Sequence, residues 1–74
     1  MTKDVTPARL RLMRERTGMT QGEVANLLHI SQQSYSAYET SRVPPADLLV
    51  ALCRLFRTSA DYLLGLTDDR RHSR

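Results

Sequence analysis

The sequence predicts an all-α fold, a compact bundle of five helices in one domain of 74 residues. Three observations support this fold class. Apolar residues recur at three- and four-residue spacing, which places them on one face of a helix. No segment alternates between apolar and polar residues as a half-buried strand does. Ser and Thr caps begin the periodic segments and Gly or Pro residues end them, which divides the chain into five parts.

The first helix is predicted to begin at Thr6, because a Thr cap followed by Pro7 is a typical helix start. Leu10 and Met13 then lie on one face, which is expected to be buried. Gly18 ends the helix, since glycine readily adopts the left-handed conformation that closes a last turn.

The second and third predicted helices are short and are joined by a tight connection. Thr20 and Glu23 have capping-box spacing at the start of the second helix, and Ser31 is a good cap for the third, which runs to about residue 39. A connection of three or four residues, with Ile30 buried in it, holds such a pair at a steep angle, so that the later helix projects. The residues expected to face the core are Val24, Ala25, Leu28, Tyr35 and Tyr38.

Two further helices and a polar tail complete the chain. Paired prolines predict a loop before the fourth helix, which runs from about Pro45 to Phe56. Ser59 caps a fifth helix that Gly65 ends. Residues 67–74 are polar and aperiodic, so they are predicted to be a disordered tail that follows a folded domain of residues 1–66. The apolar faces of the last two helices carry Leu49, Leu52, Cys53, Phe56, Leu63 and Leu64.

The charge of the chain favours an anionic partner only weakly. Eleven basic and eight acidic residues give a formal net charge of +3, and ten of the basic residues are arginine. Arginine binds phosphate oxygens bidentately, so the excess has the right sign for nucleic acid. An ordinary solvated basic surface has the same composition.

Several classes of protein do not fit the sequence. A lone Cys53 in an apolar run indicates a buried thiol in a reducing, cytoplasmic environment. No apolar run is long enough to cross a membrane, and no signal peptide is expected. The chain has no phosphate-binding glycine loop, no paired histidine motif and no nucleophile with an evident base, so we expect no enzyme, no cofactor and no metal site.

The outer side of the third helix is unusual because it carries no formal charge. Steps of about 100° per residue place Gln32, Gln33, Ser36 and Ala37 on one face, opposite the tyrosines. Glutamine pairs with adenine bidentately, serine donates or accepts, and alanine contacts a thymine methyl group. The face fits the base edges of DNA, although an ordinary polar helix surface is the alternative.

The order of motifs from about Leu10 to Leu66 adds a family resemblance. The chain resembles the Cro/cI-type (xenobiotic-response-element-like) helix-turn-helix regulators, which include the lambdoid phage repressors. This resemblance implies a lambda-repressor-like bundle of five helices whose second and third helices form the DNA-reading unit. It is carried by Met19-Thr20-Gln21, Glu23-Val24-Ala25, Leu28, Ile30-Ser31, Ser34, Tyr38-Glu39, Pro44, Phe56 and Asp61-Tyr62-Leu63-Leu64-Gly65.

The resemblance also implies roles for individual residues. It places Gln32 and Gln33 at the base-reading positions and Ser36 and Ala37 one turn later in the groove. It implies an internal ion pair between two further residues and contacts with DNA phosphates from three others. The ion pair is Arg14 with Glu39, and the phosphate contacts are Gln21, Ser31 and Arg42.

Three positions depart from the family pattern. His29 stands where the family usually has glycine in the turn, so this histidine is expected to adopt a positive φ, which His tolerates better than most residues. Thr40 and Ser41 replace a common Asn-Gly, which leaves the path of the loop and the direction of Arg42 open. Pro45 replaces a capping serine.

The expected function is that of a transcriptional regulator, a repressor that binds double-stranded DNA at a two-fold symmetric operator. One domain reads only a few base pairs, so a homodimer is expected at least on DNA. Leu63, Leu64 and Leu66 are the expected pairing surface, with a contribution from Leu48 and Leu55, unless these leucines complete the core. Two alternatives remain: an antitoxin-type module that grips a protein partner, and the amino-terminal part of a longer repressor.

Overall fold

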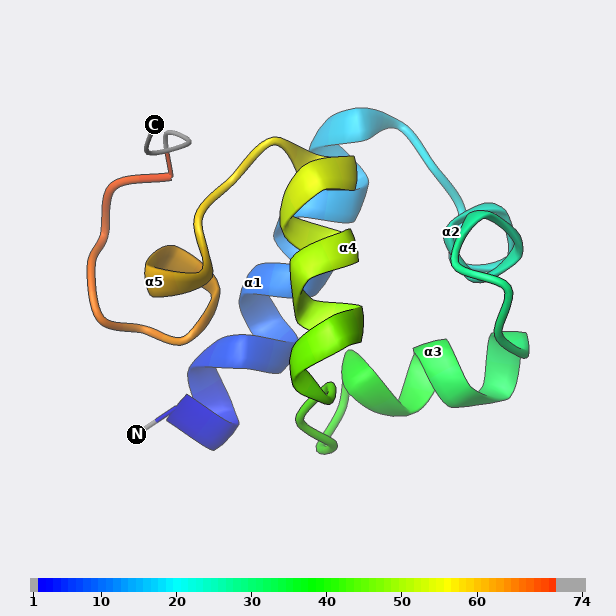
Figure 1. Ribbon diagram of the computed structural model, residues 1–74, viewed down its shortest axis with the longest axis horizontal. Coiled ribbons are helices and arrows are strands. Elements are labelled where there is room, and N and C mark those ends of the chain that lie inside the picture. Colours follow the sequence, from blue (N-terminus) through cyan, green and yellow to red (C-terminus); the bar gives the residue numbers. More distant parts are fainter. Residues whose placement is uncertain (1, 71–74) are drawn as a thin grey trace.

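The computed structural model describes the backbone of residues 2–70 and the side chains of residues 5–70. Its five helices confirm the all-α prediction. Figure 1 shows α1 and α4 crossing at the centre, with α2 and α3 on one side and α5 and the following chain on the other. Within residues 2–70, no helix has the length and apolar character needed to cross a bilayer. The helices are α1 (Thr2–Thr17), α2 (Gln21–Leu27), α3 (Gln32–Tyr38), α4 (Ala46–Phe56) and α5 (Ala60–Leu63).

The ends of most helices lie where the capping pattern predicts them. Thr20 accepts a hydrogen bond from the Glu23 backbone in a complete capping box, and Ser31 and Ser59 cap α3 and α5 with their side chains. Gly18 adopts a φ of 75°, which closes α1 as expected. Local hydrogen bonds between neighbours in sequence therefore set these boundaries.

The predicted start of α1 at Thr6 is wrong. The helix begins at Thr2 and continues through Pro7. Proline has a helical φ, and its missing N–H removes only one intrahelical bond. Thr6 and Pro7 are both buried, so their packing offsets that loss and the helix extends past them.

The core is built from residues of all five helices. Tyr35 and Tyr38 point into it, as predicted, and burial raises the pKa of the Cys53 thiol. Leu63 is completely buried in this core, so the prediction that it forms a dimer surface is wrong. The buried apolar residues are Leu10, Met13, Val24, Ala25, Tyr35, Tyr38, Leu52, Cys53, Phe56, Tyr62 and Leu63.

The other leucines assigned to pairing differ in exposure. Leu48 and Leu55 are half-buried and pack against the core. Leu64 is also half-buried. Leu66 is 71% exposed, so it does not take part in the core.

The segment after α5 is bound to the bundle rather than disordered as far as residue 70. The Arg9 guanidinium donates to the Tyr62 and Thr67 carbonyl oxygens, both at 2.6 Å, and to Asp68 at 2.8 Å. It also lies 4.2 Å from the centroid of the Tyr62 ring. The Thr58 hydroxyl donates to the Arg70 carbonyl at 2.7 Å. The prediction of a disordered tail therefore does not hold for residues 67–70, and residues 71–74 lie outside the described residues.

Replacing Arg9 with methionine is expected to destabilise the domain, because the apolar stem remains while two part-buried carbonyl groups lose a charged donor. The loss should be about 1–3 kcal/mol, the range for an uncompensated polar group together with a cation–π contact. Urea denaturation followed by circular dichroism measures it. Asp68→Asn is the matched control, since the Asp68 side chain is fully exposed (101%) and its loss should change stability little. Equal effects of the two changes would contradict the anchoring role.

Candidate nucleic-acid interface

The turn between α2 and α3 brings the two helices together at a steep angle. Figure 1 shows α2 almost end-on while α3 lies across the view. His29 has a φ of 60°, which confirms the conformation expected for a residue in the place of glycine. The Ile30 amide then donates to the Ala25 carbonyl at 3.0 Å. Ile30 is half-buried against the core, so the turn is anchored and α3 projects from the bundle.

The outward face of α3 carries the four side chains that the sequence assigns to base reading. Gln32 and Gln33 are exposed, and Ser36 and Ala37 are half-buried one turn later. Tyr35 lies on the opposite, buried side of the helix. The face therefore combines uncharged amide donors and acceptors with small side chains that let another surface approach closely.

The Ser31 side chain is engaged within the protein. Its hydroxyl oxygen accepts a hydrogen bond from the Ser34 amide at 3.0 Å, and the hydroxyl donates to the Ser34 hydroxyl oxygen at 3.0 Å. Ser31 itself is exposed at the start of α3. Its first role is thus to fix the beginning of the helix.

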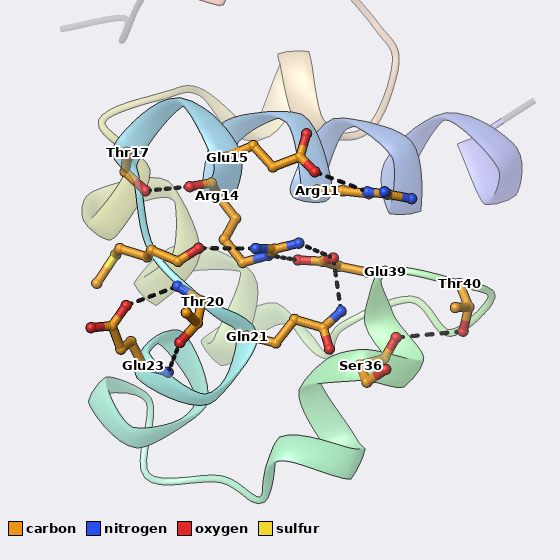
Figure 2. A network of polar contacts seen from close by, with 11 residues as sticks. Arg11, Arg14, Glu15, Thr17, Thr20, Gln21, Glu23, Ser36, Glu39 and Thr40 are labelled. Atoms are coloured by element: carbon orange, nitrogen blue, oxygen red, sulfur yellow. Dashed lines mark hydrogen bonds and ion pairs between the residues drawn. The ribbon is translucent and has the colours of Figure 1, made fainter.

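A buried polar network joins α1, α2 and the end of α3. Arg14 donates to Glu39 through Nε at 2.7 Å and through Nη2 at 3.2 Å, which is the expected internal ion pair (Figure 2). A further Arg14 nitrogen donates to the Met19 carbonyl at 2.9 Å. Figure 2 shows the Gln21 side chain reaching the same carboxylate, to which its amide nitrogen donates at 3.0 Å. The Gln21 amide is therefore used to hold α2 against α3, which differs from the free phosphate-binding group expected from the sequence.

The electrostatics of this network favour the charged pair. Burial alone would raise the pKa of the Glu39 carboxyl, but hydrogen bonds from Arg14 and Gln21, together with the nearby Tyr35 hydroxyl, outweigh burial and lower it. The hydrogen bond to Glu39 raises the pKa of Arg14. Burial, and then the nearby carboxylate, raise the pKa of the Tyr35 hydroxyl. Within residues 5–70 this hydroxyl lies near Glu39 without a hydrogen bond of standard geometry.

The loop after α3 closes without glycine. The backbone amides of Thr40, Ser41 and Arg42 all donate to the Ala37 carbonyl, at 3.1, 2.9 and 2.9 Å. The Thr40 hydroxyl adds a donor to the same oxygen at 3.0 Å. Arg42 is exposed and its guanidinium lies 5.2 Å from the centroid of the Tyr38 ring. The path left open by the sequence is thus fixed, and Arg42 stands beside the end of α3.

One contact of the site was not foreseen from the sequence. Gly22, in the first turn of α2, lies against the Gln32 side chain so closely that a Cβ atom at this glycine would be 3.2 Å from the Gln32 Oε1 atom. The one available signal was a glycine inside a helix, where it is unfavourable. Within residues 2–70 no cluster of three or more metal-ligating side chains occurs.

Comparisons with known proteins agree on one kind of protein. The family described as "Helix-turn-helix domain" matches residues 8–72. The uncharacterized HTH-type transcriptional regulator YobD of Bacillus subtilis (strain 168) is 47% identical over 62 residues, which cover 82% of this chain and 55% of YobD. The HTH-type transcriptional regulator ImmR of the same organism is 43% identical over 58 residues, 77% of this chain and 46% of ImmR. The chain spans about half the length of these curated relatives.

Proposed function

Since the chain belongs to the helix-turn-helix family of transcriptional regulators, we propose that it is a sequence-specific repressor that places α3 in the major groove of DNA. The observation that carries this proposal is the exposed, uncharged face of α3 at Gln32 and Gln33. An α-helix with its side chains is about 10–12 Å across. That diameter fits a major groove about 12 Å wide.

The side chains divide between base edges and phosphates in this proposal. Gln32 and Gln33 read bases, and Ser36 and Ala37 lie over the next base pairs. Arg42 binds a phosphate beside the groove, because it is exposed, cationic and placed at the end of α3. Ser31 is a second phosphate contact, for which its hydroxyl proton turns from the Ser34 oxygen to the DNA. Gln21 keeps the two helices aligned through Glu39.

The size of the domain supports binding as two copies. Its extents are 28 × 23 × 21 Å. Half-sites one helical turn apart are separated by about 34–36 Å, so two such domains fit side by side on one face of DNA. Leu64 and Leu66 are the proposed contacts between copies, of which Leu66 is the more exposed.

Selection of binding sites from a pool of random duplexes tests the proposal. We expect an enriched sequence with two-fold symmetry, bound by two chains when the mass of the complex is measured by light scattering. A folded sample that ignores every duplex at low salt would contradict it. Recovery of a tight protein partner together with that result would favour an antitoxin-type module instead.

Arg42→Ala is expected to weaken binding to all duplexes by a similar factor, because a phosphate contact carries no sequence information. The slope of log affinity against log salt concentration should become shallower by about 1. Fluorescence anisotropy titrations at several salt concentrations measure both effects. Arg54→Ala is the matched control, since Arg54 is an exposed arginine in the last turn of α4. Figure 1 shows this last turn at the end of α4 that points away from α3. The phosphate role fails if Arg42→Ala leaves the salt slope unchanged.

A further inference from the structure

Gly22 and Gln32 form a contact that links the first turn of α2 to the first turn of α3. An ideal Cβ atom at Gly22 would lie 3.2 Å from Gln32 Oε1 and 3.8 Å from Gln32 Cδ. The next nearest atom is Thr20 Oγ1 at 3.9 Å, so the Gln32 amide nitrogen is farther away than its oxygen. The carbonyl end of the Gln32 side chain is thus seated over the glycine.

Nothing else among residues 5–70 holds this amide. Gln32 is exposed, and no other described side chain makes a hydrogen bond with it. Glycine inside a helix is unfavourable relative to alanine because its backbone is more flexible when unfolded. Because Gly22 has no side chain, it leaves a space beside α2, and the Gln32 carbonyl group occupies that space.

We infer that Gly22 is a specificity-determining residue that acts through Gln32, an inference that rests on the proposed reading of DNA by α3. With its oxygen turned toward α2, the Gln32 amide presents mainly its NH₂ group to the groove. It then recognises a base by donation alone. Bidentate pairing with adenine needs the donor and the acceptor together. Gly22 therefore limits Gln32 to an acceptor-bearing base edge and leaves bidentate reading to Gln33.

The test compares Gly22→Ala, Gln32→Ala and the double variant on duplexes that carry each base pair at every position of the selected site. A methyl group at Gly22 displaces only the far end of a flexible side chain, so Gly22→Ala should fold and should not lower the melting temperature. It should shift preference toward adenine at one base pair by about fivefold or more, as expected when a single donor contact becomes bidentate. In the Gln32→Ala background the same change should produce no shift. Asn26 is an exposed residue of the same helix, so Asn26→Ala is the control and should leave the base preference unchanged.

A measurement on the free protein tests the contact between Gly22 and Gln32 independently of DNA binding. In the free protein, nuclear magnetic resonance should show contacts between the Gly22 Hα protons and the Gln32 side chain, and Gly22→Ala should shift the Gln32 amide resonances. If the wild type selects a DNA sequence but Gly22→Ala keeps the same base preference, the inference about Gly22 is wrong while the proposed function stands. If the wild type selects no sequence, the proposed function is wrong and this inference falls with it. A shift that persists in the Gln32→Ala background would also overturn it.

Discussion

Replacing Glu39 with glutamine is expected to lower the free energy of unfolding by about 3–5 kcal/mol, because it leaves the charge of Arg14 buried without its partner. The Glu39 side chain is 2% exposed and that of Arg14 is 13% exposed. A domain of 74 residues has a total stability of about 4–11 kcal/mol. The substitution therefore removes a large part of the margin, and urea denaturation of both proteins measures the loss.

Two further variants test whether the buried, unpaired charge of Arg14 causes this loss of stability. Glu15→Gln removes the exposed ion pair with Arg11, where the side chains are 52% and 66% exposed, and should cost less than about 0.5 kcal/mol. Combining Arg14→Met with Glu39→Leu should recover most of the stability lost in Glu39→Gln, since no charge is then left buried alone. A double variant as unstable as the single one would show that packing, rather than the stranded charge, causes the loss.

The same pair predicts how stability depends on pH. The folded protein holds the pKa of Glu39 below its ordinary value of 4.5, which the unfolded chain regains. The ion pair therefore contributes fully above about pH 4.5, and its contribution is lost as the pH falls through the lower folded pKa. The free energy of unfolding of wild type should drop more steeply below pH 4.5 than that of Glu39→Gln. Parallel curves for the two proteins would contradict this assignment.

The elements that the sequence predicted correctly are those set by neighbours in the chain. The Thr20 and Glu23 capping box and the Ser31 cap depend on groups three residues apart, so their pattern is readable directly. His29 could be assigned a positive φ because the helix-turn-helix resemblance marks that position as one that usually carries glycine. The Arg14–Glu39 pair also came from the resemblance, since 25 residues separate the partners and no local pattern connects them.

The wrong or missing predictions concern contacts between distant segments. Leu63 has the same local pattern whether it faces the core or a second copy, and only the packing of α5 on α1 decides between them. The polar residues 67–70 look like a disordered tail until the Arg9 guanidinium meets their carbonyl groups across the fold. Gly22 and Gln32 lie ten positions apart in the printed sequence, and their contact depends on the angle between α2 and α3. Composition does not encode that angle.

The second large effect is expected from Gln33→Ala, which should reduce discrimination among base pairs without weakening binding to DNA in general. A bidentate side chain contributes about 1–3 kcal/mol, a factor of about 5 to 140 in affinity for the preferred base pair over its competitors. Gln33 is exposed on the first turn of α3, and alanine is the better helix former, so the fold should tolerate the change. Anisotropy titrations with the selected duplex and its single-base-pair variants measure the discrimination directly.

The charge of the two side chains explains why Gln33→Ala and Arg42→Ala should separate cleanly. Binding to arbitrary DNA comes from cations that displace counterions from phosphates, and glutamine carries no charge, so removing Gln33 leaves this contribution and its salt slope intact. Arg42 is cationic and lies beside the helix, so its removal should lower affinity for matched and mismatched duplexes alike. The ratio of matched to mismatched affinity then falls only in Gln33→Ala. If that ratio instead survives in Gln33→Ala, the exposed amide of Gln33 does not touch bases and the assignment of roles along α3 must be redrawn.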